Sequence, residues 1–124
     1  MSNHIRRVAN GFLSNGVIGK FNQYCGVKCF IVDKKPYLLE GNQADGYCLF
    51  TISQKVLESA SGEVCEASFK GYIETVAINE FYKVDGSGYL RYNTENFTRT
   101  NDIELIDMVK EICRKQYNKE LSIY

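Results

Sequence analysis

The sequence predicts an α+β protein in which an antiparallel sheet is followed by one C-terminal amphipathic helix. Segments rich in β-branched and aromatic residues, separated by turn residues, fill the chain from residue 5 to residue 92, and a helical period appears only after residue 100. We expect a single domain over 1–124, mainly sheet over 1–100 and helical over 101–118. The sheet would contain about five to seven strands in hairpins or a meander, either open or curled toward a barrel.

The composition is that of a globular domain. Hydrophobic residues make up 44% of the chain and aromatic residues 13%, with one proline and ten glycines. Fifteen basic residues balance fifteen acidic ones, so bulk charge attracts neither DNA nor an anionic membrane, and weak self-repulsion favours self-association. The sequence lacks a long apolar run and a signal-peptide pattern, so we expect a soluble, cytoplasmic protein.

Turn residues divide the first half of the chain into short strands. Asn15-Gly16 accepts positive φ at both turn positions and predicts a tight hairpin. Pro36 closes the next turn and belongs at the edge of a strand. We expect strands at residues 5–13, 17–21, 27–32, 37–40 and 46–53. The stretch 54–60 fits either one helical turn or a loop, and the structure of residues 54–62 stays open.

The second half of the sheet is predicted from alternation and length. Residues 63–69 alternate in polarity, and residues 72–84 are long enough for a strand that bends. A last hairpin would turn at residues 85–88 and return through 89–92. The polar stretch 93–100 would then lead to the helix.

The C-terminal helix has both a predicted start and a predicted buried face. Asn101 is the expected N-cap, with Glu104 three residues later to complete a capping box. Acidic residues lie early and basic residues late, as the helix dipole favours. The residues that repeat at three- and four-residue steps and form the expected buried stripe are Ile106, Val109, Ile112, Cys113 and Tyr117.

No motif in the sequence indicates catalysis, a metal or a cofactor. His4 has no nucleophile paired with it by a known motif, and Gly86 and Gly88 lie in a predicted hairpin rather than between a strand and a helix. Cys25 and Cys29 on a strand would lie about 13 Å apart, too far for one zinc ion. We therefore expect no enzyme and no metal partner, and reduced, mostly buried thiols at Cys25, Cys29, Cys48, Cys65 and Cys113.

One group of residues fits a nucleotide. In a tight turn at residues 85–88, Tyr82 would face Arg91 and Phe81 would face Tyr92, so that Tyr82, Tyr89 and Arg91 share a face. A base stacks on an aromatic ring for about 1–3 kcal/mol, and phosphates bind Arg or Lys. The alternative, that these are ordinary strand residues and a solvated charge, stays open. The candidate ligand-binding residues are Phe81, Tyr82, Tyr89, Arg91, Asn93, Arg99, Lys110 and Arg114.

In its layout and in Phe81 or Tyr82, Asn93, Lys110 and Arg114, the chain resembles phage-encoded Thoeris anti-defence proteins, which act as cyclic-nucleotide sponges. The likeness is one of layout and residue types rather than of an aligned motif. It implies an oligomeric protein that sequesters a nucleotide-type immune messenger without cleaving it. The alternative hypothesis is a protein–protein inhibitor or adaptor that uses an exposed strand edge or the Tyr/Arg-rich surface.

Overall fold

The computed structural model describes residues 26–42, 46–84, 86 and 90–124. Its elements, in chain order, are β1 (Gly26–Val32), β2 (Lys35–Asn42), β3 (Gly46–Ile52), α2 (Gln54–Ser59), α3 (Glu66–Glu80), β4 (Tyr82–Val84), β5 (Leu90–Tyr92), β6 (Phe97–Thr100) and α4 (Ile103–Tyr117). The hairpin predicted around Asn15-Gly16 lies outside the described residues, as do Cys25 and His4.

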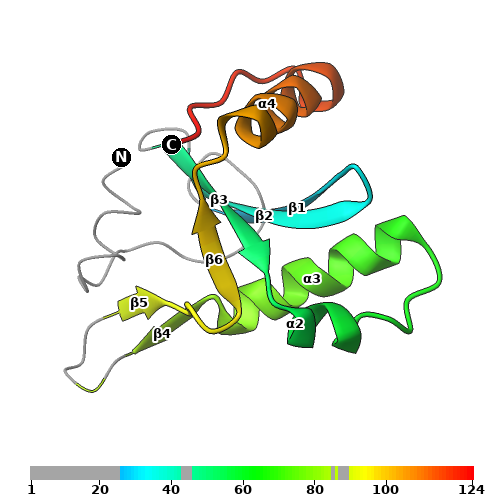
Figure 1. Cartoon of the computed structure of the whole chain (residues 1–124), viewed down its shortest axis with the longest axis vertical. Helices are drawn as coiled ribbons and strands as arrows, with labels where there is room; N and C mark the ends of the chain where they lie inside the picture. Colours follow the sequence, from blue (N-terminus) through cyan, green and yellow to red (C-terminus); the bar gives the residue numbers. More distant parts are fainter. Residues whose placement is uncertain (1–25, 43–45, 85, 87–89) are drawn as a thin grey trace.

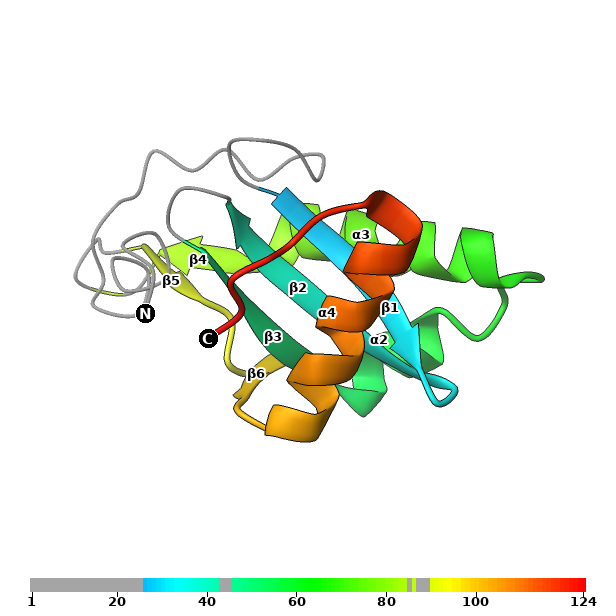
Figure 2. The same cartoon turned by 90° about the horizontal axis from the view of Figure 1, so that it is seen from above.

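A four-stranded antiparallel sheet, in the order β1-β2-β3-β6, forms the middle layer. Helix α4 covers one face, and α3, the short α2 and the separate β4–β5 hairpin lie on the other (Figure 1, and from above in Figure 2). We call these the α4 face and the α3 face. The predicted α+β class and antiparallel sheet are confirmed. Among the described strands β1 and β6 are the two ends of the sheet, so it is open and not a closed barrel.

The β1–β2 hairpin closes through a tight two-residue turn at Asp33 and Lys34. Asp33 and Lys34 both have positive φ, 51° and 68°, which is the geometry of a two-residue type I′ turn. Pro36 pairs with Ile31, and the β2–β3 ladder begins one residue later, so the missing N–H of the proline costs that ladder nothing. The predicted hairpin is confirmed, with β2 two residues longer at each end than the predicted 37–40.

Strand β3 is flanked by two segments from late in the chain. Its second half pairs with β6, from Leu49 opposite Thr100 to Ile52 opposite Phe97. Beside its first half runs the chain end, where Tyr47 donates its N–H to Ser122 and accepts one from Tyr124, both at 2.8 Å. The strand predicted at 46–53 is confirmed, and the stretch 93–100, for which no strand was predicted, contains β6 with the buried Phe97.

The strands predicted at 63–69 and over most of 72–84 are wrong, because this region forms the 15-residue helix α3. Tertiary packing outweighed the β-favouring composition, as it often does for aromatic and β-branched residues. The open stretch 54–60 contains α2 and its end. The residues of α3 that are buried or pack against the core do repeat at helical steps: Phe69, Tyr72, Ile73, Val76 and Ala77.

The predicted C-terminal helix is present as α4, although its cap lies one residue later than expected. Asp102, not Asn101, is the N-cap, and its carboxylate accepts the N–H of Leu105 at 3.3 Å. Asn118 ends the helix in the left-handed conformation, with φ of 52°. The buried residues of α4 are Leu105, Ile106, Val109 and Cys113, while Ile112 and Tyr117 are partly buried against the same cluster.

Alternation along β2 supplies one core to each face of the sheet. Leu38 belongs to the cluster of the α3 face and its neighbour Leu39 to the cluster of the α4 face, and both are fully buried. Burying one such side chain stabilises the fold by about 1.5–3 kcal/mol. Helix α3 also covers part of the outer edge of β1, where the Glu74 carboxylate accepts the Cys29 N–H at 2.8 Å.

Candidate functional site

The β4–β5 hairpin carries the predicted aromatic–cationic residues, but its register differs by one residue from the predicted one. Tyr82 pairs with Tyr92, and Arg91 pairs with Lys83. The predicted pairs Tyr82–Arg91 and Phe81–Tyr92 are therefore wrong. Because neighbouring positions of a strand belong to opposite faces, Tyr82 and Arg91 occupy register positions of different faces. The connection spans residues 85–89 rather than 85–88, and Tyr89 lies outside the described residues.

Phe81 is a core residue. It has no exposed surface and makes a T-shaped contact with Phe50, at 4.9 Å between ring centroids. Tyr92 stacks against it at 5.9 Å, and the Phe97 ring lies at 5.3 Å. A ring enclosed on this many sides offers no free face on which a base could stack.

The basic residues predicted on the helix lie across the sheet from the hairpin. Lys110 and Arg114 belong to α4, whereas Tyr82 packs against the cluster of the α3 face. The exposed Arg114 guanidinium is also engaged, with Glu111 at 2.7 Å and Glu120 at 3.3 Å. Within one chain these two parts of the predicted site are separated by the sheet, and only a neighbouring subunit could bring them together.

The structure does bring Tyr82 and Arg99 to the same face, around a carboxylate that sequence reasoning missed. Glu40 is 1% exposed and accepts a hydrogen bond from the Tyr82 hydroxyl at 2.7 Å. Its cross-strand partner is Cys48, and Arg99 pairs with Phe50 of the same face. Burial raises the pKa of the Cys48 thiol to about 11, with Arg99 lowering it and Glu40 raising it.

Glu40 could have been found from the alternation of β2. Leu38 and Glu40 are two residues apart and so share a face, which places an acidic residue at a core position. A buried carboxylate is unfavourable unless it is hydrogen-bonded, so such a position signals a polar partner. Asn93 was predicted to bind a ligand, but in the structure its side-chain oxygen accepts a hydrogen bond from the Glu95 N–H at 3.1 Å.

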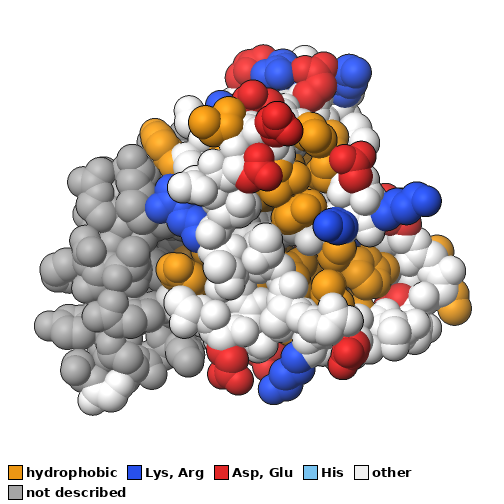
Figure 3. All heavy atoms as spheres, viewed as in Figure 1, with side chains coloured by type: hydrophobic (Ala, Val, Ile, Leu, Met, Phe, Trp, Pro, Cys, Tyr) orange, Lys and Arg blue, Asp and Glu red, His pale blue; other side chains and the backbone are white. Residues whose placement is uncertain are grey.

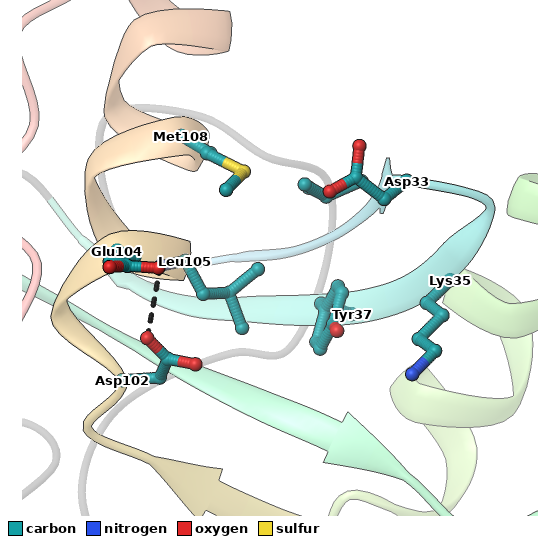
Figure 4. A pocket seen from close by; sticks show the side chains of 8 residues that line it. Asp33, Lys35, Tyr37, Asp102, Glu104, Leu105 and Met108 are labelled. Carbon is teal, nitrogen blue, oxygen red and sulfur yellow. Dashed lines mark hydrogen bonds between the residues drawn. The ribbon is translucent and has the colours of Figure 1, made fainter.

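A second candidate site is a hollow of about 180 Å³ between α4 and the β1–β2 hairpin. Figure 4 shows Leu105 and Met108 approaching from α4, opposite Asp33, Lys35 and Tyr37 from the hairpin. Its remaining lining residues are Val32, Asp102 and Glu104. We call this the α4 hollow. It combines an apolar floor with a rim that carries three carboxylates and one ammonium group.

Local folding explains how each residue of the α4 hollow comes to lie there. Asp33 occupies the hairpin turn, and Asp102 is bound to the first turn of α4 as its cap. Glu104 lies at the positive end of the helix dipole, an ordinary place for an acid. Figure 3 shows acidic side chains over α4, with Lys and Arg side chains among them at the top and apolar surface below.

Two apolar side chains of α4 are exposed to solvent. Met108, which lines the hollow, is 41% exposed, and Ile103, in the first turn of the helix, is 73% exposed. A further hollow of about 240 Å³ lies between α2 and α3, lined by Lys55, Val56, Ser59, Tyr72, Val76, Glu80 and Asn96. Both hollows are smaller than the roughly 300–1,000 Å³ of typical small-molecule sites.

A search for a metal site, a search for a membrane-spanning helix and the comparisons with known proteins do not identify a function for the described part of the chain. In the part of the chain that the structure describes, no group of three or more His, Cys, Asp or Glu side chains could hold a metal ion. None of the helices within the described ranges has the length and apolar character needed to cross a bilayer. Comparison with protein-family models, with curated proteins and with solved structures found no significant match.

Proposed function

We propose that this protein is a non-catalytic binding protein that inhibits or recruits another protein through the surface around the α4 hollow. The observation that carries this proposal is that an exposed apolar side chain of α4 borders a small hollow. Met108 is 41% exposed and lines the hollow one helical turn from the floor residue Leu105, and Ile103 exposes further apolar surface in the first turn of the same helix. Apolar anchors around a side-chain-sized pocket are typical of the centre of a protein interface.

Size and charge favour a protein over a free nucleotide at this site. The volume of the hollow, about 180 Å³, is below the roughly 300 Å³ at which small-molecule sites ordinarily begin, whereas one apolar side chain of a partner would fill it. Its rim carries more carboxylates than ammonium groups, which repels phosphate. A macromolecular partner can place one side chain in the hollow and keep its remaining contacts outside.

The test is an affinity purification with tagged full-length protein from its native source, run beside two matched variants. Met108→Gln removes apolar surface from the proposed interface, and Ile78→Gln does the same at an equally exposed position of α3, since both residues are 41% exposed. We expect a stoichiometric partner with the wild type and with Ile78→Gln, and its loss with Met108→Gln. Equal recovery with all three proteins would contradict the assigned surface.

Sequestration of a nucleotide-type signalling molecule, as in a phage counter-defence sponge, is the second candidate function. It has one observation in its favour, because Tyr82, Tyr92 and Arg99 share the α3 face. The buried Glu40 carboxylate beside Tyr82 opposes it, since negative charge there disfavours a phosphate. Such a site would need a second subunit to supply Lys110 or Arg114.

Native mass spectrometry of freshly purified protein separates the two functions, because it reports subunit number and any retained small molecule together. The nucleotide function predicts an oligomer that carries excess mass and, with no tryptophan in the chain, raised absorbance at 260 nm. Calorimetry against a cyclic-nucleotide panel should then give binding that Arg99→Ala weakens. A ligand-free protein that shows no heat with the panel would remove this candidate.

A further inference from the structure

We infer that the α4 hollow receives a short segment of a partner protein in which a lysine or arginine lies next to one apolar side chain. This inference rests on the proposed function and adds the chemistry of the partner. The apolar side chain enters the hollow, and the basic group reaches the rim. The argument has three steps, which concern the floor, the rim and the exclusion of a second copy of this chain.

The floor of the hollow fits one aliphatic side chain. Leu105 is almost fully buried, Tyr37 is partly buried, and Met108 is 41% exposed at the opening. The unbranched, polarizable Met side chain adapts its shape to whatever lies against it, and is favoured at surfaces that bind other chains. A volume of about 180 Å³ admits one such side chain and leaves the rest of the partner on the outside.

The rim sets the charge of the partner. The lining of the hollow contains three acidic residues, Asp33, Asp102 and Glu104, and one basic residue, Lys35. Its formal net charge is therefore minus two, in a chain whose formal net charge is zero. Among the described residues, neither Asp33 nor Glu104 forms an ion pair or a side-chain hydrogen bond. Charge complementarity across an interface therefore selects a cationic segment and speeds its association.

The two halves of the rim come from separate elements that meet only in the folded protein. Asp33 belongs to the β1–β2 turn, and Glu104 to the first turn of α4, on the other side of the hollow (Figure 4). A capping role explains Asp102 and a turn role explains Asp33, but neither role requires both groups to border one apolar floor. That convergence is what suits a segment carrying both kinds of side chain.

A second copy of this chain is a poor occupant. In a two-fold symmetric dimer centred on the hollow, the acidic rim of one copy would meet the acidic rim of the other. Like charges in such a contact oppose association. The partner is therefore a different protein.

The experiment selects binders from a random heptapeptide display library with full-length protein as bait. The best sequence, made as a fluorescent peptide, is then measured by fluorescence polarization. We expect selected sequences to combine Lys or Arg with Leu, Ile, Met or Phe. Glu104→Lys and Met108→Gln should each weaken binding about tenfold or more. The matched controls are Glu66→Lys, in the exposed first turn of α3, and Ile78→Gln, and both should leave the affinity unchanged.

Salt and oligomeric state provide the remaining readouts. Affinity of the wild type for the peptide should fall as ionic strength rises, and Glu104→Lys should reduce that dependence. Peptides without basic residues, failure to select any peptide, or binding insensitive to both Glu104→Lys and Met108→Gln would overturn the inference. Peptides that bind at another surface would leave a protein-binding function standing. A wild-type dimer that Met108→Gln dissociates in analytical ultracentrifugation would identify a second copy as the occupant and also overturn it.

Discussion

The two faces of the sheet are held by different interactions. On the α4 face the buried cluster is apolar and aromatic, and it continues into a hollow that is open to solvent. On the α3 face, polar groups lie within or beside the core: Glu40 accepts the Tyr82 hydroxyl, and Glu74 accepts the Cys29 N–H. The polar groups of the α3 face are thus used in contacts within the chain, whereas the α4 face carries the hollow at which we propose that a partner binds.

This difference follows from the directionality of hydrogen bonds. Apolar packing tolerates small shifts, but a buried carboxylate is stabilised only by donors in the right place. Tyr82 is 42 residues from Glu40 in sequence, so their bond ties the β4–β5 hairpin to the centre of the sheet. Tyr82, which we predicted for a ligand, makes this contact within the fold.

The largest expected effect is the loss of the aromatic centre of the α3 face. Phe81→Ala leaves a cavity among Phe50, Tyr92 and Phe97, and should lower the free energy of unfolding by about 3–5 kcal/mol. Urea denaturation measures this. Ile103→Ala, at a 73% exposed position of α4, is the control and should change stability by less than about 0.5 kcal/mol. Similar costs at both positions would contradict the contrast between the two faces.

The parts of the fold that could be predicted are those with a strong local signal. The β1–β2 turn, β3 and α4 were all predicted, because turn residues, β-branched runs and a clean helical stripe each act within a few residues. Helix α3 was missed because a short polarity alternation at 63–69 imitates a strand, although Tyr72, Ile73 and Val76 keep helical spacing. Strand β6 was missed because its partner β3 lies far away in sequence.

The predicted site depended on the hairpin register, which sequence alone does not determine. One additional residue in the turn exchanges the faces of every later position, and moves Arg91 from opposite Tyr82 to opposite Lys83. The α4 hollow could not be predicted either, because its rim joins Asp33 to Glu104 across the tertiary structure. Glu40 was the exception, since its inward position follows from the alternation of β2 alone.

A smaller effect is expected from removing the single hydroxyl that binds Glu40. Tyr82→Phe deprives the buried carboxylate of a donor at 2.7 Å and should lower the free energy of unfolding by about 1.5–3 kcal/mol, as for hydrogen bonds to charged groups. Tyr92→Phe is the matched control, because Tyr92 is the cross-strand partner of Tyr82 and its hydroxyl has no hydrogen-bond partner among the described residues. It should be nearly neutral in the same denaturation assay.

If Tyr82→Phe and Tyr92→Phe lowered the free energy of unfolding equally, the hydrogen bond between the Tyr82 hydroxyl and Glu40 would contribute nothing specific to the stability of the α3 face. The same hydrogen bond ties the β4–β5 hairpin to strand β2. Hydrogen exchange at the β4–β5 amides should therefore quicken in Tyr82→Phe more than in Tyr92→Phe.

The last prediction concerns the chemical reactivity of cysteine thiols, which should differ between α3 and α4 with little effect on stability. Cys65 caps α3, is fully exposed, and forms a hydrogen bond with Ser68 that lowers the pKa of its thiol below the ordinary value. Burial raises the pKa of Cys113 in α4 to about 11. At pH 7.5 we expect a thiol-alkylating reagent to modify Cys65 about a hundredfold or more faster than Cys113, as measured by peptide mass spectrometry.

The pH dependence of this labelling tests its cause. Because only the thiolate reacts, the rate at Cys65, whose pKa is lowered, should reach its plateau at a lower pH than the rates at Cys29 and Cys48, whose pKa values burial raises to about 12 and about 11. Ser68→Ala removes the hydrogen bond and should move the Cys65 curve to higher pH. An unchanged curve in Ser68→Ala would assign the reactivity of Cys65 to exposure alone, and would leave the first turn of α3 without an electrostatic role in it.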